Sequence, residues 1–242
     1  MKILLLNCLA ALLVFSSCSP SYYPPKINAP LLREEGETKI NAAVNLNSIN
    51  IQGSTALTDK FAIAASVNGY WVGAAQITTS NGSITDESSN GFQIDFMPGY
   101  YVPFGDVGVI ELYGGYGAGL SNSGEVSGLL HRLIFQPSIG VSGERFEFAF
   151  ACRFSHVMIP KSASLSDPQT SFADTFLEPG LIFRLGSDKV KFTTQIGFSL
   201  PIVNIEDDPF GNYIEWNPMI VNVGFQINIE NIGFKESGKW QK

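Results

Sequence analysis

Charged residues and cysteines are scarce in this chain, and each shortage excludes a class of function. Only 15% of the 242 residues are charged, well below the roughly 25% that is usual for soluble domains. The 15 Lys and Arg are outnumbered by 22 Asp and Glu, and the net charge of −7 leaves no overall basic field to hold a nucleic acid. The 3 cysteines are Cys8, Cys18 and Cys152. Because the first two lie in or directly after an N-terminal leader, we expect no intramolecular disulfide.

No apolar run in the sequence is long enough for a transmembrane helix. The run at 3–14 is shorter than the roughly 20 residues that a helix needs to cross a bilayer. Lys2 precedes this run and two small residues at 16–17 follow it, which is the order of a signal peptide. We therefore expect residues 1–17 to be removed and the mature chain to contain no transmembrane helix.

Motifs of catalysis and metal binding are also missing. The sequence has no Walker-type glycine loop, no paired-cysteine metal spacing, no HExxH and no GxSxG. The glycine-rich stretch at 114–119 lies inside an alternating segment and no helical pattern follows it, so it does not predict a phosphate loop. Cys152 has the apolar neighbours Phe150 and Phe154, which disfavour the thiolate that a catalytic cysteine needs. We expect neither an enzyme nor a bound metal or cofactor.

What the chain does have is strict alternation of apolar and polar residues from Glu37 to Glu230. In the last segment, for example, Val221, Val223 and Phe225 interleave with polar or small residues. Such alternation predicts β-strands with two different faces. Ten segments show it: 37–46, 48–58, 61–72, 91–102, 107–119, 131–142, 145–157, 175–186, 189–200 and 218–229.

The connections between these segments alternate in length. Short links follow the second, fourth, sixth and eighth segments, and much longer ones follow the third, fifth, seventh and ninth. An even number of ~10-residue alternating strands, with short turns at one end and long loops at the other, is typical of an outer-membrane barrel. We predict an all-β fold: an antiparallel up-and-down transmembrane β-barrel of about ten strands over 37–230, followed by a polar tail over 231–242. Both chain ends are then expected on the periplasmic side.

Aromatic residues occur where the girdles of such a barrel belong. Tyr70 and Trp71 fall at one end of their strand, and Tyr100, Tyr101 and Phe104 fall at the opposite end of the next strand.

Cys18 directly follows the small pair Ser16-Ser17, and this junction resembles the lipobox of bacterial lipoproteins. Together with the strand pattern, the mature chain resembles the small outer-membrane β-barrel lipoproteins of Gram-negative bacteria, common in the Bacteroidota. The resemblance implies that Cys18 is acylated and that residues 18–36 form an extended periplasmic tether. No surface-export signal of the lysine-acid kind follows Cys18, so we expect the lipid in the periplasmic leaflet. It also implies outer-membrane lipid as the partner, and we expect a monomer. An ordinary secretory signal, with no lipid, is the alternative.

Charged residues on the inward faces of two neighbouring segments predict their register. In an antiparallel pair of strands, the numbers of residues that lie opposite each other add to one constant total. The numbers of Glu147 and Arg184 add to the same total as those of Arg153 and Glu178, so one register brings both opposite-charge pairs together. Two roles remain open for these pairs. They either plug a narrow lumen as structural ion pairs, or they form a charged constriction that selects ions.

Three other functions stay open beside a structural or binding role. The first is a small-solute channel. The second is a rim enzyme, a protease or lipid-modifying enzyme, because His131 and His156 fall at the predicted external rim. The residues Ser155, Asp167, Ser171 and Asp174 are nearby in sequence. Plain polar rim residues are the simpler explanation of the two histidines. The third is a soluble periplasmic barrel lipoprotein whose apolar faces point inward to a core or an apolar ligand.

Overall fold

The computed structural model of this chain contains strands and no helix among the residues it describes. These residues are 20–78, 84–123, 126–160, 171–202, 214 and 216–229. Within them, no helix is long and apolar enough to cross a membrane. Cys8 and Cys18, Asp167 and the tail at 231–242 lie outside the described residues.

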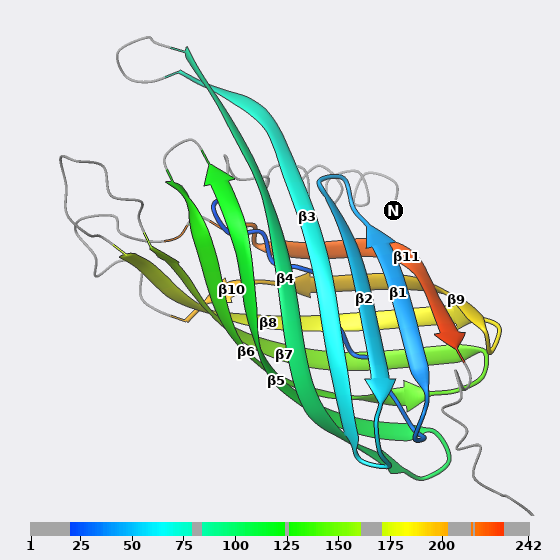
Figure 1. Ribbon diagram of the computed structural model, residues 1–242. Helices are drawn as coiled ribbons and strands as arrows, with labels where there is room; N and C mark the ends of the chain where they lie inside the picture. Colours follow the sequence, from blue (N-terminus) through cyan, green and yellow to red (C-terminus); the bar gives the residue numbers. More distant parts are fainter. Residues whose placement is uncertain are drawn as a thin grey trace, which may run out of the picture.

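The strands close into an antiparallel barrel (Figure 1). From β1 to β9 each strand pairs with the next one in sequence, and closure comes from β11, which pairs with β9 on one side and β1 on the other. The short β10 follows β9 after Ser199 and continues its pairing with β8, so the barrel has ten strands. The prediction of an all-β, ten-stranded antiparallel barrel is confirmed. The strands are β1 (Thr38–Val44), β2 (Ser48–Ala56), β3 (Phe61–Thr78), β4 (Ile84–Phe104), β5 (Gly108–Ser123), β6 (Val126–Ser142), β7 (Phe146–Pro160), β8 (Ser171–Gly186), β9 (Val190–Phe198), β10 (Leu200–Pro201) and β11 (Met219–Ile229).

The two ends of the barrel differ in their connections. One end, here called the turn end, carries the short links 57–60, 105–107, 143–145 and 187–189; the other is called the loop end. Strands β3 to β8 run further toward the loop end than the sequence predicted, and only two residues separate β5 from β6 there. The reason is that backbone pairing continues through stretches such as 86–90 and 121–123, which are polar and do not alternate with apolar residues, so the sequence pattern does not predict it. The longest strands, β3 and β4, form a hairpin that extends well beyond its neighbours (Figure 1).

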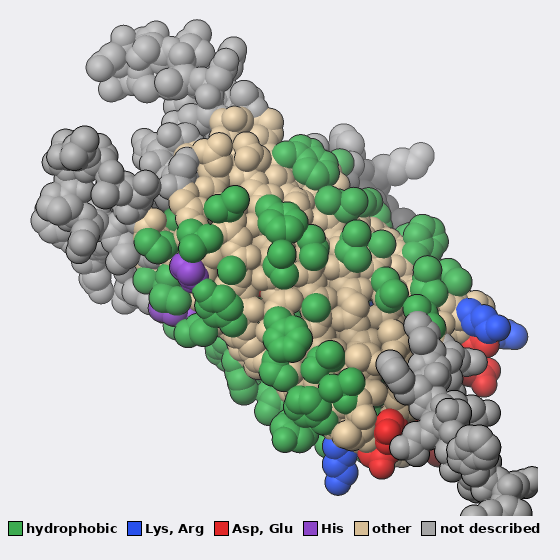
Figure 2. All heavy atoms as spheres, viewed as in Figure 1, with side chains coloured by type: hydrophobic (Ala, Val, Ile, Leu, Met, Phe, Trp, Pro, Cys, Tyr) green, Lys and Arg blue, Asp and Glu red, His purple; other side chains and the backbone are tan. Residues whose placement is uncertain are grey.

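Apolar and polar faces are inverted relative to a soluble protein. Large apolar side chains such as Phe96, Phe150 and Phe225 are exposed on the outside of the barrel, and Figure 2 shows hydrophobic side chains spread over one outer face. Where the structure describes strand side chains, every charged one faces the lumen: Lys39, Asp95, Glu111, Arg132, Glu147, Arg153, Asp174, Glu178, Arg184 and Lys191. Outward-facing charges gather at the turn end, at the lower right of Figure 2. The apolar faces of the strands therefore point outward, whereas the soluble alternative expected them to point inward.

Two of the five aromatic residues expected in girdles point inward instead. Tyr70 and Tyr101 are buried in the lumen, whereas Trp71, Tyr100 and Phe104 are exposed on the outer face. Adjacent residues of a strand point to opposite faces, so one member of each pair had to lie inside.

Three prolines lie inside strands, each beside a short break in a ladder. The β4–β5 ladder skips Pro98, the β6–β7 ladder skips Pro137, and Pro179 borders the start of β8–β9 pairing. The register is the same on both sides of the first two breaks. Since proline has no N–H to donate, each ladder loses bonds locally without a bulge.

The largest departure from the sequence prediction is the segment before β1. Residues 20–32 are all buried and run inside the barrel (Figure 1); this segment is called the thread below. It was expected outside the barrel as part of a free tether. The thread enters at the loop end, where Ser21 contacts Ser121 and Ser123, and leaves at the turn end, where Leu32 contacts Glu111. Residue 20 and Ile229, the two ends of the described chain, thus lie at opposite ends of the barrel, not at the same end as predicted.

Candidate functional site

The lumen and its thread form the candidate functional site. Apart from one bridge between Tyr22 and Trp216, the thread joins no β-ladder. Its backbone polar groups are nevertheless buried, and a buried carbonyl without a partner is costly. Side chains of the barrel wall therefore have to supply the missing hydrogen bonds.

Donors from four different strands bind four backbone carbonyls of the thread between Pro25 and Ala29. Two are arginines and two are glutamines, and each reaches inward from its strand. The bonds run from Arg153 Nη2 to Pro25 O (2.8 Å), Gln52 Nε2 to Lys26 O (2.8 Å), Gln136 Nε2 to Asn28 O (2.7 Å) and Arg184 Nη2 to Ala29 O (2.6 Å). The wall thus clamps the thread along its length.

At the loop end the thread is held by Tyr22. Its hydroxyl donates to Glu178 Oε1 (2.9 Å) and accepts a bond from Arg132 Nη1 (2.9 Å). Its ring packs on Phe176, with 5.0 Å between centroids. Arg132 in turn forms a buried ion pair with Asp95, with 2.6 Å between Nη2 and Oδ2. One thread side chain therefore joins two ion-paired clusters of the wall.

The two ion pairs expected from the sequence lie in this lumen, in one register of β7 and β8. Glu147 is the Cα partner of Arg184, and Arg153 is the partner of Glu178. Their N···O distances are 2.8 Å and 2.5 Å, and all four side chains are at least 97% buried. The sequence did not show that each arginine also binds a thread carbonyl, because that contact needs the position of the thread.

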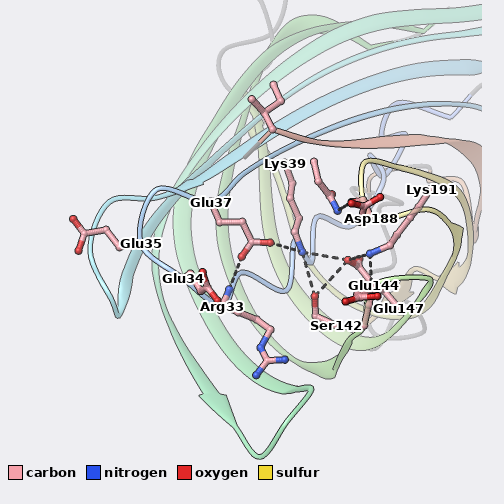
Figure 3. Close-up of a pocket in the computed structure, with 13 residues that line it drawn as sticks. Arg33, Glu34, Glu35, Glu37, Lys39, Ser142, Glu144, Glu147, Asp188 and Lys191 are labelled. Carbon is pink, nitrogen blue, oxygen red and sulfur yellow. Dashed lines mark hydrogen bonds and ion pairs between the residues drawn. The ribbon is translucent and has the colours of Figure 1, made fainter. Parts of the chain in front are cut away.

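Glu147 is the most heavily coordinated carboxylate in the described lumen. Besides Arg184 it pairs with Lys39 Nζ (3.3 Å) and Lys191 Nζ (2.7 Å), which come from β1 and β9. Figure 3 shows these two lysines and Ser142 converging on Glu147 at the turn end. Lys39 also donates to Leu31 O of the thread (3.0 Å). A pocket of about 300 Å³ opens beside this cluster toward the turn end.

Apolar side chains of the thread pack against small residues of the wall. Ile27, Leu31 and Leu32 belong to one buried core cluster with Ala149 and Ala151 of β7. Gly180 of β8 leaves room for Ile27, because a Cβ at this glycine would lie 2.7 Å from Ile27 Cδ1. The small inward residues that the sequence shows in these strands are therefore the complement of a bulky thread.

The two histidines lie on the outer face of the barrel, away from the lumen. His131 Nδ1 bonds Tyr116 Oη, and His156 Nδ1 bonds Thr175 Oγ1 at 2.9 Å. Both were expected at the rim, but β6 and β7 continue past them toward the loop end. Ser155 faces the lumen, where it donates to Glu178 Oε2, and Asp174 accepts a bond from Ile214 N. Among the described residues, the structure thus places both histidines on the outer face, opposite to Ser155 and Asp174.

Cys152 is a free, half-buried thiol on the same face of β7 as Phe150 and Phe154. Among the described residues no group of three or more His, Cys, Asp or Glu has the arrangement of a metal site. The chemistry that the described lumen offers is therefore the holding of a chain by hydrogen bonds and buried ion pairs.

Comparison with known proteins adds no relative: no model of a protein family matches the chain, and no curated protein matches it. The functional argument therefore depends on the geometry of the barrel and its thread.

Proposed function

We propose that this chain is an outer-membrane β-barrel lipoprotein, anchored through Cys18, whose lumen is closed by its own thread. It has a structural or binding role in the membrane, and its lumen does not conduct solutes. The observation that carries this proposal is the inversion of faces, with charged strand residues inside and large apolar residues outside. A barrel with this inversion buries its outer surface best in lipid.

The height of the apolar surface supports this environment. On β5 the outward side chains from Ile110 to Leu120 are apolar, aromatic or small. At about 3.3 Å per residue and a strand tilt near 40°, this stretch rises about 25 Å, the height of the apolar band of outer-membrane barrels. Trp71 and Tyr100, on the outer face, are residue types that favour the membrane–water interface.

The anchor rests on the Ser16-Ser17-Cys18 junction. The Sγ of Cys18 would displace the phosphate-bearing headgroup of a glycerophospholipid, so that a C–S thioether forms, the C–O bond to the phosphate breaks, and the thiol proton leaves with the headgroup. The diacylglyceryl group that remains on Cys18 then holds the chain in a leaflet.

The closed lumen separates this role from that of a channel. The purified barrel, inserted in a planar bilayer, should show no single-channel conductance steps. A variant lacking residues 20–32 should conduct, because the space that the thread fills is then open to water and ions. If the deletion does not fold, Gly-Ser replacement at 22–29 preserves chain length and removes the bulky and charged side chains. Steady conductance of the unaltered protein would contradict the closed lumen. Failure of the protein to float with membrane lipid in a density gradient would contradict its place in the membrane.

A further inference from the structure

The direction of the thread fixes the end of the barrel at which Cys18 emerges. At the loop end, Asn217 N donates to Tyr22 O (3.0 Å) and Ser121 Oγ donates to Ser21 O (2.6 Å). At the turn end, Arg33 donates from Nη2 to Gly105 O (3.4 Å), in the turn between β4 and β5. The chain then turns at Gly36, which has a φ of 82°, and enters β1 from the turn end.

Chain length makes the position of Cys18 unambiguous. Cys18 is two residues from Pro20, and two residues span at most about 7 Å. To reach the turn end, Cys18 would have to return through a lumen that the thread already fills, over a barrel height of about 25 Å. From Pro20, residue 18 can therefore reach the loop end but not the turn end.

We infer that the lipid on Cys18 is inserted in the outer leaflet at the cell surface, and that the chain passes from this lipid back through its own barrel to the periplasmic side. This inference rests on the proposed function, which supplies the acylated Cys18. In outer-membrane barrels the short turns face the periplasm and the longer loops face the exterior. Since Cys18 is at the loop end, its lipid lies on the side opposite to that expected from the sequence alone.

The packing of the lumen implies an order of assembly. Arg132, Arg153 and Glu178 are almost completely buried around Tyr22 of the thread, so the described part of the closed barrel leaves no passage for acyl chains. The lipid therefore cannot be pulled through after closure. The strands have to close around a thread whose lipidated end is already on the loop side.

A protease site inserted between Ser19 and Pro20 of the full chain tests the side of the membrane directly. Cells are labelled with a palmitate analogue, and protease is added either to intact cells or after the outer membrane is permeabilised. We expect protease on intact cells to separate most of the lipid label from the barrel. The matched control carries the same site between Gly238 and Lys239, after the last strand, and should be cut only after permeabilisation.

The outcomes distinguish this inference from the proposed function. A label that is released only after permeabilisation places the lipid on the periplasmic side, which overturns the inference and leaves the lipoprotein barrel intact. Cleavage of the control site in intact cells also overturns it, because the turn end then faces outward. Absence of label from the chain contradicts the proposed anchor itself. If the inserted site disturbs folding, Ser19→Cys probed with a membrane-impermeant maleimide replaces it: labelling in intact cells supports the inference, and labelling only after permeabilisation overturns it.

Discussion

Replacement of Glu147 by glutamine tests whether the charge cluster at the turn end stabilises the barrel. The carboxylate pairs with Lys39, Arg184 and Lys191, and its side chain is only 1% exposed. Glu147→Gln keeps the shape of the side chain and removes the charge, so Arg184 and Lys191 lose their acidic partner and Lys39 keeps only Glu37. Removal of one partner from a buried ion pair typically costs about 3–5 kcal/mol. We expect a loss in the free energy of unfolding at or above this range, because three cations are affected.

The matched control uses the same chemical change on another partner of Lys39. Glu37 Oε1 lies 3.0 Å from Lys39 Nζ, but the Glu37 side chain is 24% exposed. Water screens this pair and can solvate what remains, so Glu37→Gln should cost no more than about 1 kcal/mol. The measurement is urea unfolding of the barrel in lipid vesicles, followed by tryptophan fluorescence and by the migration of folded and unfolded bands on gels. Equal losses for the two variants would refute the argument.

A second substitution measures how much of the stability loss comes from the unpaired Arg184. Adding Arg184→Gln to Glu147→Gln removes one of the cations that have lost an acidic partner, and it should restore part of the stability. Restoration should be incomplete, because Lys39 and Lys191 stay buried and because Arg184 no longer donates to Ala29 O of the thread. Full restoration would mean that the two lysines contribute nothing to the cluster.

Two further substitutions test the outer face and the fit of the thread. Phe150→Arg should make membrane insertion less favourable by about 2–4 kcal/mol, the cost of an arginine near the bilayer midplane. The control variant Phe150→Leu should insert normally. Equal insertion yields of the two variants in refolding assays would mean that this face does not contact lipid. Gly180→Val should lower the free energy of unfolding in urea by about 1–3 kcal/mol, because the added side chain overpacks against Ile27 Cδ1. Ile27→Ala in the same chain should offset part of this loss. Strictly additive losses would show that Ile27 does not occupy that space.

The strands could be predicted from the sequence because each has two chemically different faces. A shift of one residue exchanges those faces completely, so the side that each residue takes is strongly specified. The residue numbers of two charge pairs then gave the register of β7 and β8, which the structure shows. The extensions of β3 to β8 at the loop end carry no such signal, because stretches such as 86–90 and 121–123 do not alternate apolar with polar residues although their backbones pair.

The thread was missed for a related reason. Local patterns predict structure only where a segment repeats with a period, and residues 20–32 have neither a helical nor a strand period. A signal was nevertheless present. A free tether in water has no need for Tyr22, Ile27 and Leu31, and its residues 20–32 include only one charged side chain, Lys26. Their place in the lumen also requires that the chain enter the barrel at the loop end, which no local pattern of the sequence specifies.

The thread also accounts for an inner wall that is charged rather than merely polar. A barrel with an apolar outer face needs a polar inner face, because the chemical difference between the two faces of each strand fixes the register. Small polar residues alone would meet that need, but they would leave the carbonyls of Pro25 and Ala29 without donors. Arg153 and Arg184 reach those carbonyls, and Glu178 and Glu147 compensate their charges inside the barrel. The ion pairs of the lumen are therefore best understood as the means by which the wall binds a backbone that no strand accompanies.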